Sequence, residues 1–191
     1  KELAKHIMED IDPEFPKKAE EGREDEIMHC IGCAQGCFDH LFQLQPVACL
    51  CNPRAGCEKE TVLVKAAQKK KVLVIGGGPA GMSAAAAAKA RGHDVVLYEK
   101  SDDLGGQLWL AGAMPGRDEF IQLALDLAKQ LELRNVRIEL SREVDDTVIE
   151  KEKPDFAIVA TGAEPIVPPI PGVQLPHVVQ AWDVLAGLAR T

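Results

Sequence analysis

The chain has 191 residues, of which 46% are hydrophobic and 27% are charged, a composition typical of a folded globular protein rather than a disordered one. The 30 acidic residues outnumber the 22 basic ones, and a net charge of -8 argues against a nucleic-acid partner, because a phosphate backbone attracts positive charge. No apolar stretch is long enough to cross a bilayer and the N-terminus lacks the layout of a secretory signal, so we predict a cytoplasmic protein without a membrane partner.

The two ends of the sequence suggest a larger parent. The chain begins at Lys1 rather than Met, and residues 188–191 read as part of an unfinished element. We therefore expect a piece of a longer polypeptide. Residues 1–28 are charged and predicted to be partly helical, with Pro13 and Pro16 as interruptions.

Residues 29–70 form a segment of different character. All six cysteines lie between Cys30 and Cys57, among glycines and prolines that predict loops with short helical turns, and residues 58–70 read as a connector. Disulfides tie distant segments together and are rare in the cytosol. Crowding of this kind therefore points to a metal centre.

From residue 71 the pattern becomes that of an α/β domain. Continuous apolar runs predict buried strands, and an alanine-rich stretch and a stripe of apolar residues at helical spacing predict helices. The alternation predicts a Rossmann-like fold with a parallel sheet over residues 71–165, followed by a proline-rich linker over 166–191. The predicted elements are strand 72–75, helix 79–91, strand 94–98, helix 118–131, strand 136–140 and buried strand 156–160.

A glycine-rich loop joins the first strand to the first helix. Residues 76–81, GGGPAG, satisfy the G-x-G-x-x-G pattern of dinucleotide-binding folds. Gly76 can make the tight turn, Gly78 lets the backbone approach a pyrophosphate, and Gly81 lets the helix pack on the strand. The free N–H groups of the helix N-terminus would bind the phosphates.

An acidic residue stands where such a fold needs one. Glu99 follows the second strand, 18 residues after Gly81, where it can accept hydrogen bonds from an adenosine ribose. A carboxylate disfavours a 2′-phosphate, so the expected nucleotides are FAD, NAD or ADP rather than NADP.

The cysteine spacing is C-x2-C-x3-C-x11-C. Four thiolates so close in sequence suit either a [4Fe–4S] cluster or structural zinc, and the spacing alone does not decide between them. A redox cofactor site immediately downstream favours the cluster. The predicted ligands are Cys30, Cys33, Cys37 and Cys49.

Other residues near this set have open or minor roles. Cys51 and Cys57 could be spare thiols, an alternative ligand pair or a redox-sensitive couple, and we favour spare thiols. His29 and His40 are at most outer partners of ligands. No set of residues for hydrolytic catalysis stands out, so we predict no catalytic residue in the chain.

Two further segments, residues 104–108 (LGGQL) and 160–162 (ATG), resemble the second glycine pair and the ATG turn of flavoprotein reductases that bind two dinucleotides. The resemblance implies that these segments line an FAD site and lead toward an NAD(P)H domain. We therefore favour FAD, with ADP as the alternative. The residues assigned to the cofactor are Gly76, Gly78, Pro79, Ala80, Gly81, Glu99, Lys100, Gly106, Gln107, Ala160, Thr161 and Gly162.

Nearly the whole chain resembles one family. The sequence CIGCAQGCFD at residues 30–39, PVAC at 46–49 and NPRAG at 52–56 is similar to the segment after the flavin barrel in NADH:flavin oxidoreductases. This is the group of 2,4-dienoyl-CoA reductase and trimethylamine dehydrogenase, relatives of old yellow enzyme. Residues 12–19 look like the last stretch of the barrel.

The resemblance implies a relay in a larger enzyme. Its members carry an FMN-bearing TIM barrel, a [4Fe–4S] segment and an FAD domain split by an NAD(P)H domain, and electrons pass from the nicotinamide through FAD and the cluster to FMN and an enoyl-type or amine substrate. The barrel and the NAD(P)H domain are missing here and are the expected partners, so we expect the isolated chain to be inactive on substrate. The alternatives are a module that binds ADP structurally, or a zinc-stapled nucleotide-binding domain without a redox role.

Overall fold

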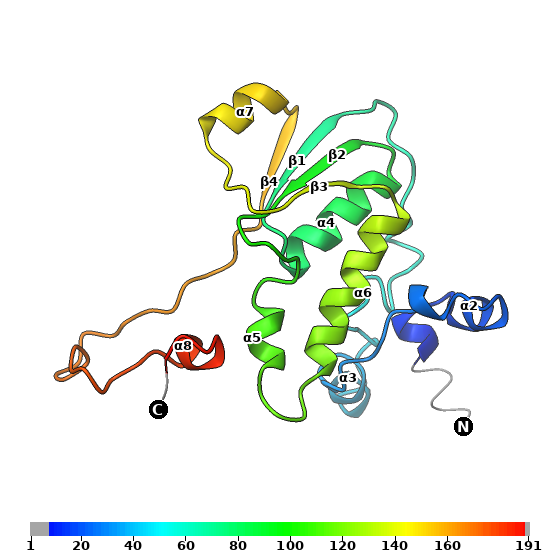
Figure 1. Cartoon of the computed structure of the whole chain (residues 1–191). Helices are drawn as coiled ribbons and strands as arrows, with labels where there is room; N and C mark the ends of the chain where they lie inside the picture. Colours follow the sequence, from blue (N-terminus) through cyan, green and yellow to red (C-terminus); the bar gives the residue numbers. More distant parts are fainter. Residues whose placement is uncertain (1–7, 190–191) are drawn as a thin grey trace.

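The computed structural model describes residues 8–189, with a four-stranded sheet at its centre (Figure 1). The strand order is β3-β2-β1-β4 and every neighbouring pair is parallel. The predicted α/β fold with a parallel sheet is therefore confirmed. The strands are β1 (Lys71–Ile75), β2 (Asp94–Tyr98), β3 (Arg137–Glu139) and β4 (Phe156–Val159).

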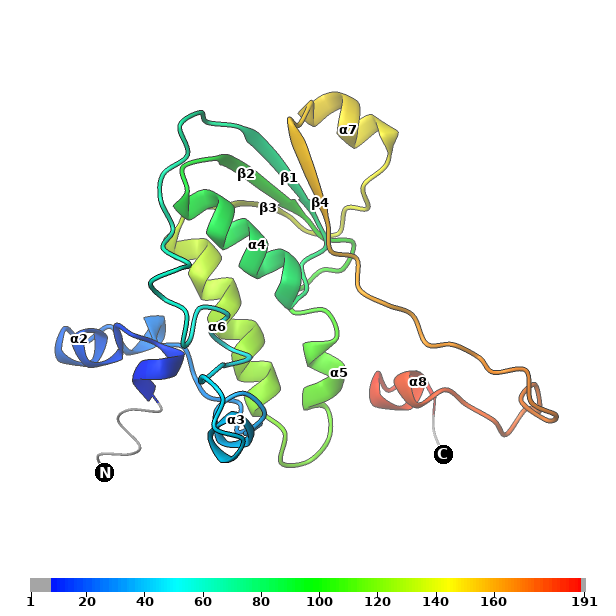
Figure 2. The same ribbon diagram turned by 180° about the vertical axis from the view of Figure 1, so that it is seen from behind.

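Helices cover both faces of this sheet. On one face, α4 (Pro79–Ala90) and α6 (Glu119–Leu133) lie beside each other, with the short α5 (Leu108–Gly112) next to α6; α7 (Asp146–Glu152) lies on the other face (Figures 1 and 2). Alternate residues of β1 serve the two sides, because side chains of a strand point to opposite faces. Val72 and Val74 join the core beneath α4 and α6, and Leu73 joins the core with α7.

The sequence did not predict α5 and α7. Helix α7 is short and begins with a cap: the Asp145 carboxylate accepts a hydrogen bond from the Val148 N–H at 3.0 Å. It ends at Lys153, whose φ of 46° lies in the left-handed region. Such a helix depends on its cap and on two buried residues, Val148 and Glu152, so it shows little periodicity in the sequence.

The expectation that strand 156–160 is buried was wrong. Phe156 and Val159 of β4 are 61% and 71% exposed. Strand β4 pairs with β1 and has no second neighbour among residues 8–189. An apolar run predicted the strand correctly, but its burial depends on neighbours that the run cannot specify.

The N-terminal part packs against the side of the α/β unit, around α6 (Figure 2). It contains α2 (Phe15–Glu20), the 3-10 helix η1 (Glu24–Glu26) and α3 (Phe38–Phe42), joined by irregular chain, as the loop-rich prediction requires. Pro16 lies in the first turn of α2, where its missing N–H costs nothing, so it starts a helix rather than interrupting one.

The C-terminal part leaves the sheet after β4. Residues 163–170 have no regular structure, and the chain runs away from the sheet to α8 (Ala181–Leu185), a short helix within the predicted linker 166–191 (Figure 1). Among the described residues, none of the helices combines the length and the apolar character needed to cross a membrane.

Candidate functional site

The glycine loop folds as a tight turn between β1 and α4. Gly76 has a φ of 111°, which L side chains rarely adopt, and a Cβ there would overlap the carbonyl oxygen of Ala160. A Cβ on Gly81 would overlap the carbonyl oxygen of Gly76. Both positions therefore require glycine for contacts within the protein, and they bring the start of α4 close to the ends of β1 and β4.

Gly78 differs from its neighbours. Its φ of -73° suits any residue, and a Cβ at this position would meet no protein atom within 4 Å. The protein itself therefore gives no reason for glycine at 78. The space beside it lies at the N-terminus of the 12-residue helix α4, where free N–H groups and the helix dipole favour an anion.

The Glu99 side chain reaches back to this loop. Its carboxylate accepts hydrogen bonds from the Gly77 N–H at 2.5 Å and from the Ser101 N–H at 2.8 Å, and the residue is 8% exposed. Each carboxylate oxygen has a second lone-pair direction, so these bonds leave room for ribose hydroxyls. Glu99 thus holds the loop as well as standing at the predicted ribose position.

The second glycine pair lies against the first loop. The Gly105 N–H donates to the Gly77 carbonyl oxygen at 2.9 Å, and a Cβ on Gly106 would lie 3.2 Å from the Gly78 Cα. The Gln107 side-chain amide donates to the Ala163 carbonyl oxygen at 3.1 Å. The segments that the sequence assigned to one cofactor therefore meet at the carboxyl edge of the parallel sheet, where α/β folds bind ligands.

The remaining residues assigned to the cofactor are open to solvent. Pro79 and Ala80 are exposed in the first turn of α4, and Thr161 and Gly162 are exposed after β4. Lys100 is also exposed, directly after Glu99. Residues that contact a ligand must be accessible to it, and these five residues are accessible.

A second feature is a pocket formed by the cysteine segment. The four predicted ligands, Cys30, Cys33, Cys37 and Cys49, all line it, and Cys51 lines it too. The other lining residues are mainly small or apolar, among them Ile11, Ile31 and Ala48. All six cysteines are free, and Cys51 is buried.

The close approach of residues 36 and 48 brings the fourth cysteine to the first three. The Ala48 N–H donates to the Gly36 carbonyl oxygen at 2.8 Å, and a Cβ on Gly36 would overlap the carbonyl oxygen of Ala48. Cys37 directly follows Gly36, and Cys49 directly follows Ala48, so each cysteine is next in sequence to one of the two residues in contact. Glycine at position 36 therefore allows the chain to fold back after Cys37, so that the eleven intervening residues return it to Cys49.

Two kinds of metal centre use four thiolates, and they differ in how the sulfurs are spaced. Zinc binds thiolates at about 2.3 Å in a tetrahedron, which places their sulfurs about 4 Å apart. In a [4Fe–4S] cluster each thiolate binds its own iron, so the ligands surround a pocket, and the cysteines here do so.

Hydrogen-bond donors surround two sulfurs of the pocket. The Gly32 N–H donates to the Cys30 sulfur at 3.3 Å, helped by a left-handed φ of 63° at Gly32. A hydrogen bond from the Cys51 thiol, with further ones from the backbone N–H groups of Asn52 and Cys51, lowers the pKa of Cys49. The same contact with Cys49 and burial raise the pKa of Cys51. Cys49 is thus favoured as a thiolate, the form that binds metal.

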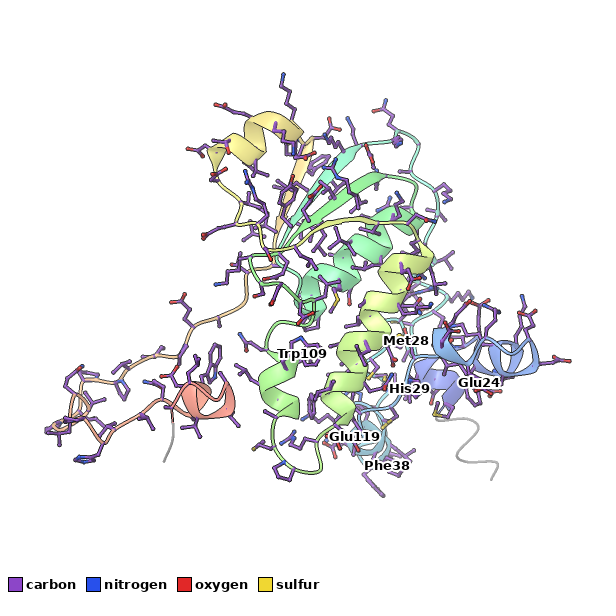
Figure 3. The ribbon with its side chains drawn as sticks, viewed as in Figure 1. Glu24, Met28, His29, Phe38, Trp109 and Glu119 are labelled. Atoms are coloured by element: carbon purple, nitrogen blue, oxygen red, sulfur yellow. The ribbon has the colours of Figure 1, made fainter. Side chains whose placement is uncertain are left out.

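Helix α6 joins the two features. The buried Asp126 carboxylate accepts a hydrogen bond from the His29 backbone N–H at 2.7 Å, and it lies 3.0 Å from His29 Nδ1. Figure 3 shows His29 beside α6. Two residues earlier, the Ala124 side chain lies against Gly105, where a Cβ would approach it to 2.9 Å. Residues two apart are about 200° apart around a helix. The helix therefore contacts the glycine pair on one side and the residue before Cys30 on the other.

Three residues lie at these sites without a strong signal in the sequence. Asp126 lies in an ordinary amphipathic stripe, and nothing local marks it as the partner of a residue 97 positions away. Cys51, which we favoured as a spare thiol, is buried and lines the cysteine pocket, two residues after Cys49. Trp109 of α5, labelled in Figure 3, donates its indole N–H to the Leu104 carbonyl oxygen at 2.8 Å and so supports the second glycine pair.

Comparison with known proteins extends these observations. Residues 70–189 match the family described as pyridine nucleotide-disulphide oxidoreductase. The chain is 43% identical over 194 residues to a metal reductase of Desulforamulus reducens, covering 98% of this chain, and 47% identical over 181 residues to an NADH oxidase of Thermoanaerobacter brockii, covering 92%. It spans 28% of the length of each of these relatives.

A solved structure shows the same fold. A 2-naphthoyl-CoA reductase in complex with 2-naphthoyl-CoA superposes with a TM-score of 0.91 and 37% sequence identity, covering 96% of this chain and 28% of the reductase. The match includes both the cysteine segment and the α/β unit, since it leaves out only a few residues. The family match from residue 70 onward, by contrast, does not include the cysteines.

Proposed function

The chain belongs to the pyridine nucleotide-disulphide oxidoreductase family, and on that premise we propose that it is the electron-transfer core of a multi-cofactor NAD(P)H:flavin oxidoreductase. The three relatives named above are oxidoreductases, so a general redox role is common to them. The proposal concerns the cofactors: FAD at the edge of the sheet and a [4Fe–4S] cluster in the cysteine pocket. Six free cysteines also suit the reducing cytoplasm, which we propose as its location.

The residues at the sheet edge fit a dinucleotide. Gly78 leaves space that the protein does not fill, and the N-terminus of α4 faces that space with unpaired N–H groups. Glu99 fixes the loop through the Gly77 N–H and offers further acceptor positions to ribose hydroxyls. The Gly105–Gly106 turn lies against the same loop and can cover the pyrophosphate from the other side.

The cysteine pocket fits a cluster. Cys30, Cys33, Cys37 and Cys49 would hold it, backbone N–H groups donate to two of their sulfurs, and the apolar lining limits contact with water. When bound, a flavin exchanges electrons in pairs or singly and an iron–sulfur cluster exchanges them singly, so the two together can convert a two-electron donor into a one-electron supply.

The observation that carries the proposal is the shared helix. Through Ala124 and Asp126, α6 holds the Gly105 turn and the His29–Cys30 segment in fixed positions relative to each other. A structural zinc site and an isolated nucleotide site both function without a fixed distance between them. Electron transfer between two centres does gain from it, since its rate depends on a fixed separation.

The rest of the relay belongs to segments outside this chain. We propose that NAD(P)H is the donor and that FMN in a barrel domain accepts the electrons for an enoyl-type or amine substrate. Two of the three relatives named above are reductases by name, a metal reductase and a 2-naphthoyl-CoA reductase, which agrees with a reducing role. The isolated chain should therefore not turn over substrate.

One preparation tests the cofactor assignment. The chain is purified anaerobically and its visible spectrum, iron, acid-labile sulfide and zinc are measured on the same sample. About four irons per chain with broad absorbance near 400 nm would support the cluster. Stoichiometric zinc without iron, together with failed reconstitution by iron and sulfide, would refute it.

ADP is the second candidate for the sheet edge. The described contacts concern the loop, the helix N-terminus and Glu99, all of which serve the adenosine and pyrophosphate end of a dinucleotide. Flavin released on denaturation of the purified chain and identified by its fluorescence distinguishes FAD from ADP.

A further inference from the structure

We infer that Trp109 is a positioning residue of the dinucleotide site: its indole holds the Gly105–Gly106 turn against the glycine loop, where the turn can bind phosphates. The inference rests on the proposed function, because it requires a nucleotide with a pyrophosphate at the sheet edge. It assigns to a side chain outside the glycine motifs a share of the affinity for the phosphates, separate from the affinity for adenosine.

The indole lies directly on the backbone of the turn. Trp109 is in the first turn of α5, at the end of that helix nearest the sheet (Figure 3). Its Nε1–H donates to the Leu104 carbonyl oxygen at 2.8 Å, and a Cβ on Gly105 would lie only 2.7 Å from Nε1. Gly105 has a φ of 123°, which favours glycine. The indole and this backbone conformation therefore depend on each other.

Other contacts join the turn to the glycine loop. The Gly105 N–H donates to the Gly77 carbonyl oxygen at 2.9 Å, and the Leu104 side chain lies so close to Gly77 that a Cβ there would approach it to 2.6 Å. The Ala124 methyl group lies against Gly105 from α6. Loss of the Trp109 donor would leave these contacts in place but free the Leu104 carbonyl, so the turn would be less restrained rather than unfolded.

The restrained turn carries free donors beside the phosphate position. Among residues 8–189, no backbone oxygen accepts from the N–H groups of Gly106 and Gln107. Gly106 lies next to Gly78, at the start of α4, because a Cβ on Gly106 would be 3.2 Å from the Gly78 Cα. Phosphate oxygens accept hydrogen bonds from such N–H groups. A turn that is already in place costs no ordering when the ligand binds, and this raises the affinity.

The turn and Glu99 act on different parts of the ligand. Glu99 stands at the predicted ribose position, whereas the turn adjoins the phosphate position. Loss of the indole donor should therefore weaken the binding of ADP and leave the binding of adenosine, which has no phosphate, nearly unchanged. A purely structural role of Trp109 would not separate the two ligands.

The test uses Trp109→Phe, which keeps an aromatic ring beside Gly105 and removes the donor. Trp109 is 36% exposed, so the smaller ring does not empty a core position. The control is the same substitution at the second tryptophan, Trp182→Phe on α8. Calorimetric titration measures the affinity for ADP, titration followed by nuclear magnetic resonance measures the affinity for adenosine, and circular dichroism measures folding.

We expect Trp109→Phe to bind ADP about fivefold more weakly, the effect of one lost hydrogen bond, and to bind adenosine within about twofold of the wild type. Trp182→Phe should match the wild type with both ligands.

A second measurement leaves Trp109 itself intact. In the Trp182→Phe chain, Trp109 gives the single indole N–H resonance. Bound ADP should slow the exchange of this proton with solvent by about threefold or more, because phosphates that bind the turn hold it in its closed position. This result is available even if Trp109→Phe does not fold.

Three results would overturn the inference. They are an unchanged ADP affinity in folded Trp109→Phe, an equal loss of affinity for ADP and adenosine, and an indole exchange rate that ADP does not alter. In each of these cases the wild type still binds ADP and the proposed nucleotide site stands. A wild-type chain that binds no ADP would instead refute the nucleotide site and, with it, this inference.

Discussion

The buried Asp126 carboxylate and the His29 backbone N–H form a hydrogen bond of 2.7 Å between residues 97 positions apart in sequence. The Gln122 side chain also donates to Asp126, at 2.8 Å, and holds the carboxylate on its helix. Exposed pairs such as Lys129 and Asp25 add contacts at the surface. The Asp126–His29 contact is therefore a polar link, with a buried carboxylate, between the cysteine segment and the α/β unit.

Replacing Asp126 with alanine should loosen this link. The His29 N–H loses its acceptor, so we expect a loss of about 2 kcal/mol in unfolding free energy. Amide hydrogen exchange should become faster in residues 29–51, with little change in β1 and β2. The control is Lys129→Ala, whose exposed ion pair contributes less than about 1 kcal/mol. Equal exchange in both variants would contradict a specific role of Asp126.

Two glycine substitutions should separate folding from binding. Gly81→Ala places a methyl group against the Gly76 carbonyl oxygen and should destabilise the domain by about 1 to 3 kcal/mol. Gly78→Ala meets no protein atom, so its melting temperature should stay close to the wild type while its affinity for added ADP falls at least tenfold. Thermal unfolding and calorimetric titration with ADP measure the two effects. Full ADP affinity in Gly78→Ala would show that the nucleotide does not pass this position.

Loss of one predicted ligand should remove iron. Cys37→Ser is expected to retain less than half of the wild-type iron after anaerobic reconstitution, because each cysteine of the pattern binds a different iron. Cys57→Ser, outside the pocket, should retain all of it. Iron per folded chain, by colorimetric assay after gel filtration, is the measurement. If the two variants lose iron equally, the ligand set is wrong.

Chelation offers a complementary check on the loaded protein. Stripping iron should expose the pocket thiols to a thiol reagent faster than it changes the far-ultraviolet circular dichroism, since the sheet and its helices do not line the pocket. Unfolding of the whole chain on iron removal would contradict this separation.

Stability should depend on pH through Glu152. Burial alone would raise the pKa of its carboxyl group, but hydrogen bonds from Arg137, Lys71 and Tyr98 outweigh burial and hold the pKa at about 2. A depressed pKa in the folded state stabilises the fold fully above the unfolded value near 4.5, and this contribution is lost as the pH falls toward 2.

Urea unfolding of Glu152→Gln at several pH values measures this contribution. The variant should be less stable than the wild type by about 2 kcal/mol at pH 7, with the difference closing between pH 4.5 and 2. Glu150→Gln, exposed on the same helix, should change stability by less than about 0.5 kcal/mol. A pH-independent difference for Glu152→Gln would indicate a packing effect instead.

The sequence predicted β1, β2, α4 and α6 well because each carries a strong local signal. An apolar run, a glycine-rich turn or an amphipathic stripe determines its element with little help from the rest of the chain. The glycine loop and the cysteine pattern were found for the same reason. The exposure of β4 was mispredicted, since burial of a strand depends on the elements beside it.

The features that could not be predicted from the sequence depend on contacts between residues far apart in the chain. Asp126 gains its hydrogen bond from the His29 N–H only when the cysteine segment packs against α6. Cys51 meets the backbone of Ile31 only when residues 48–51 fold back onto that residue. Gly36 could have been noticed, but its reason is the carbonyl of Ala48, twelve residues later. Such roles arise from tertiary packing, which no local pattern describes.

The residues that line the cysteine pocket all fall between Asp10 and Cys51, ahead of β1 at residue 71. During synthesis on a ribosome they emerge before any part of the dinucleotide site exists. The cysteine segment can therefore begin to fold early, while Asp126 arrives about 75 residues later and fastens this segment to the sheet domain. The order of residues along the chain thus sets a natural order of folding, with the cysteine segment ahead of the glycine loop and the helix that supports both.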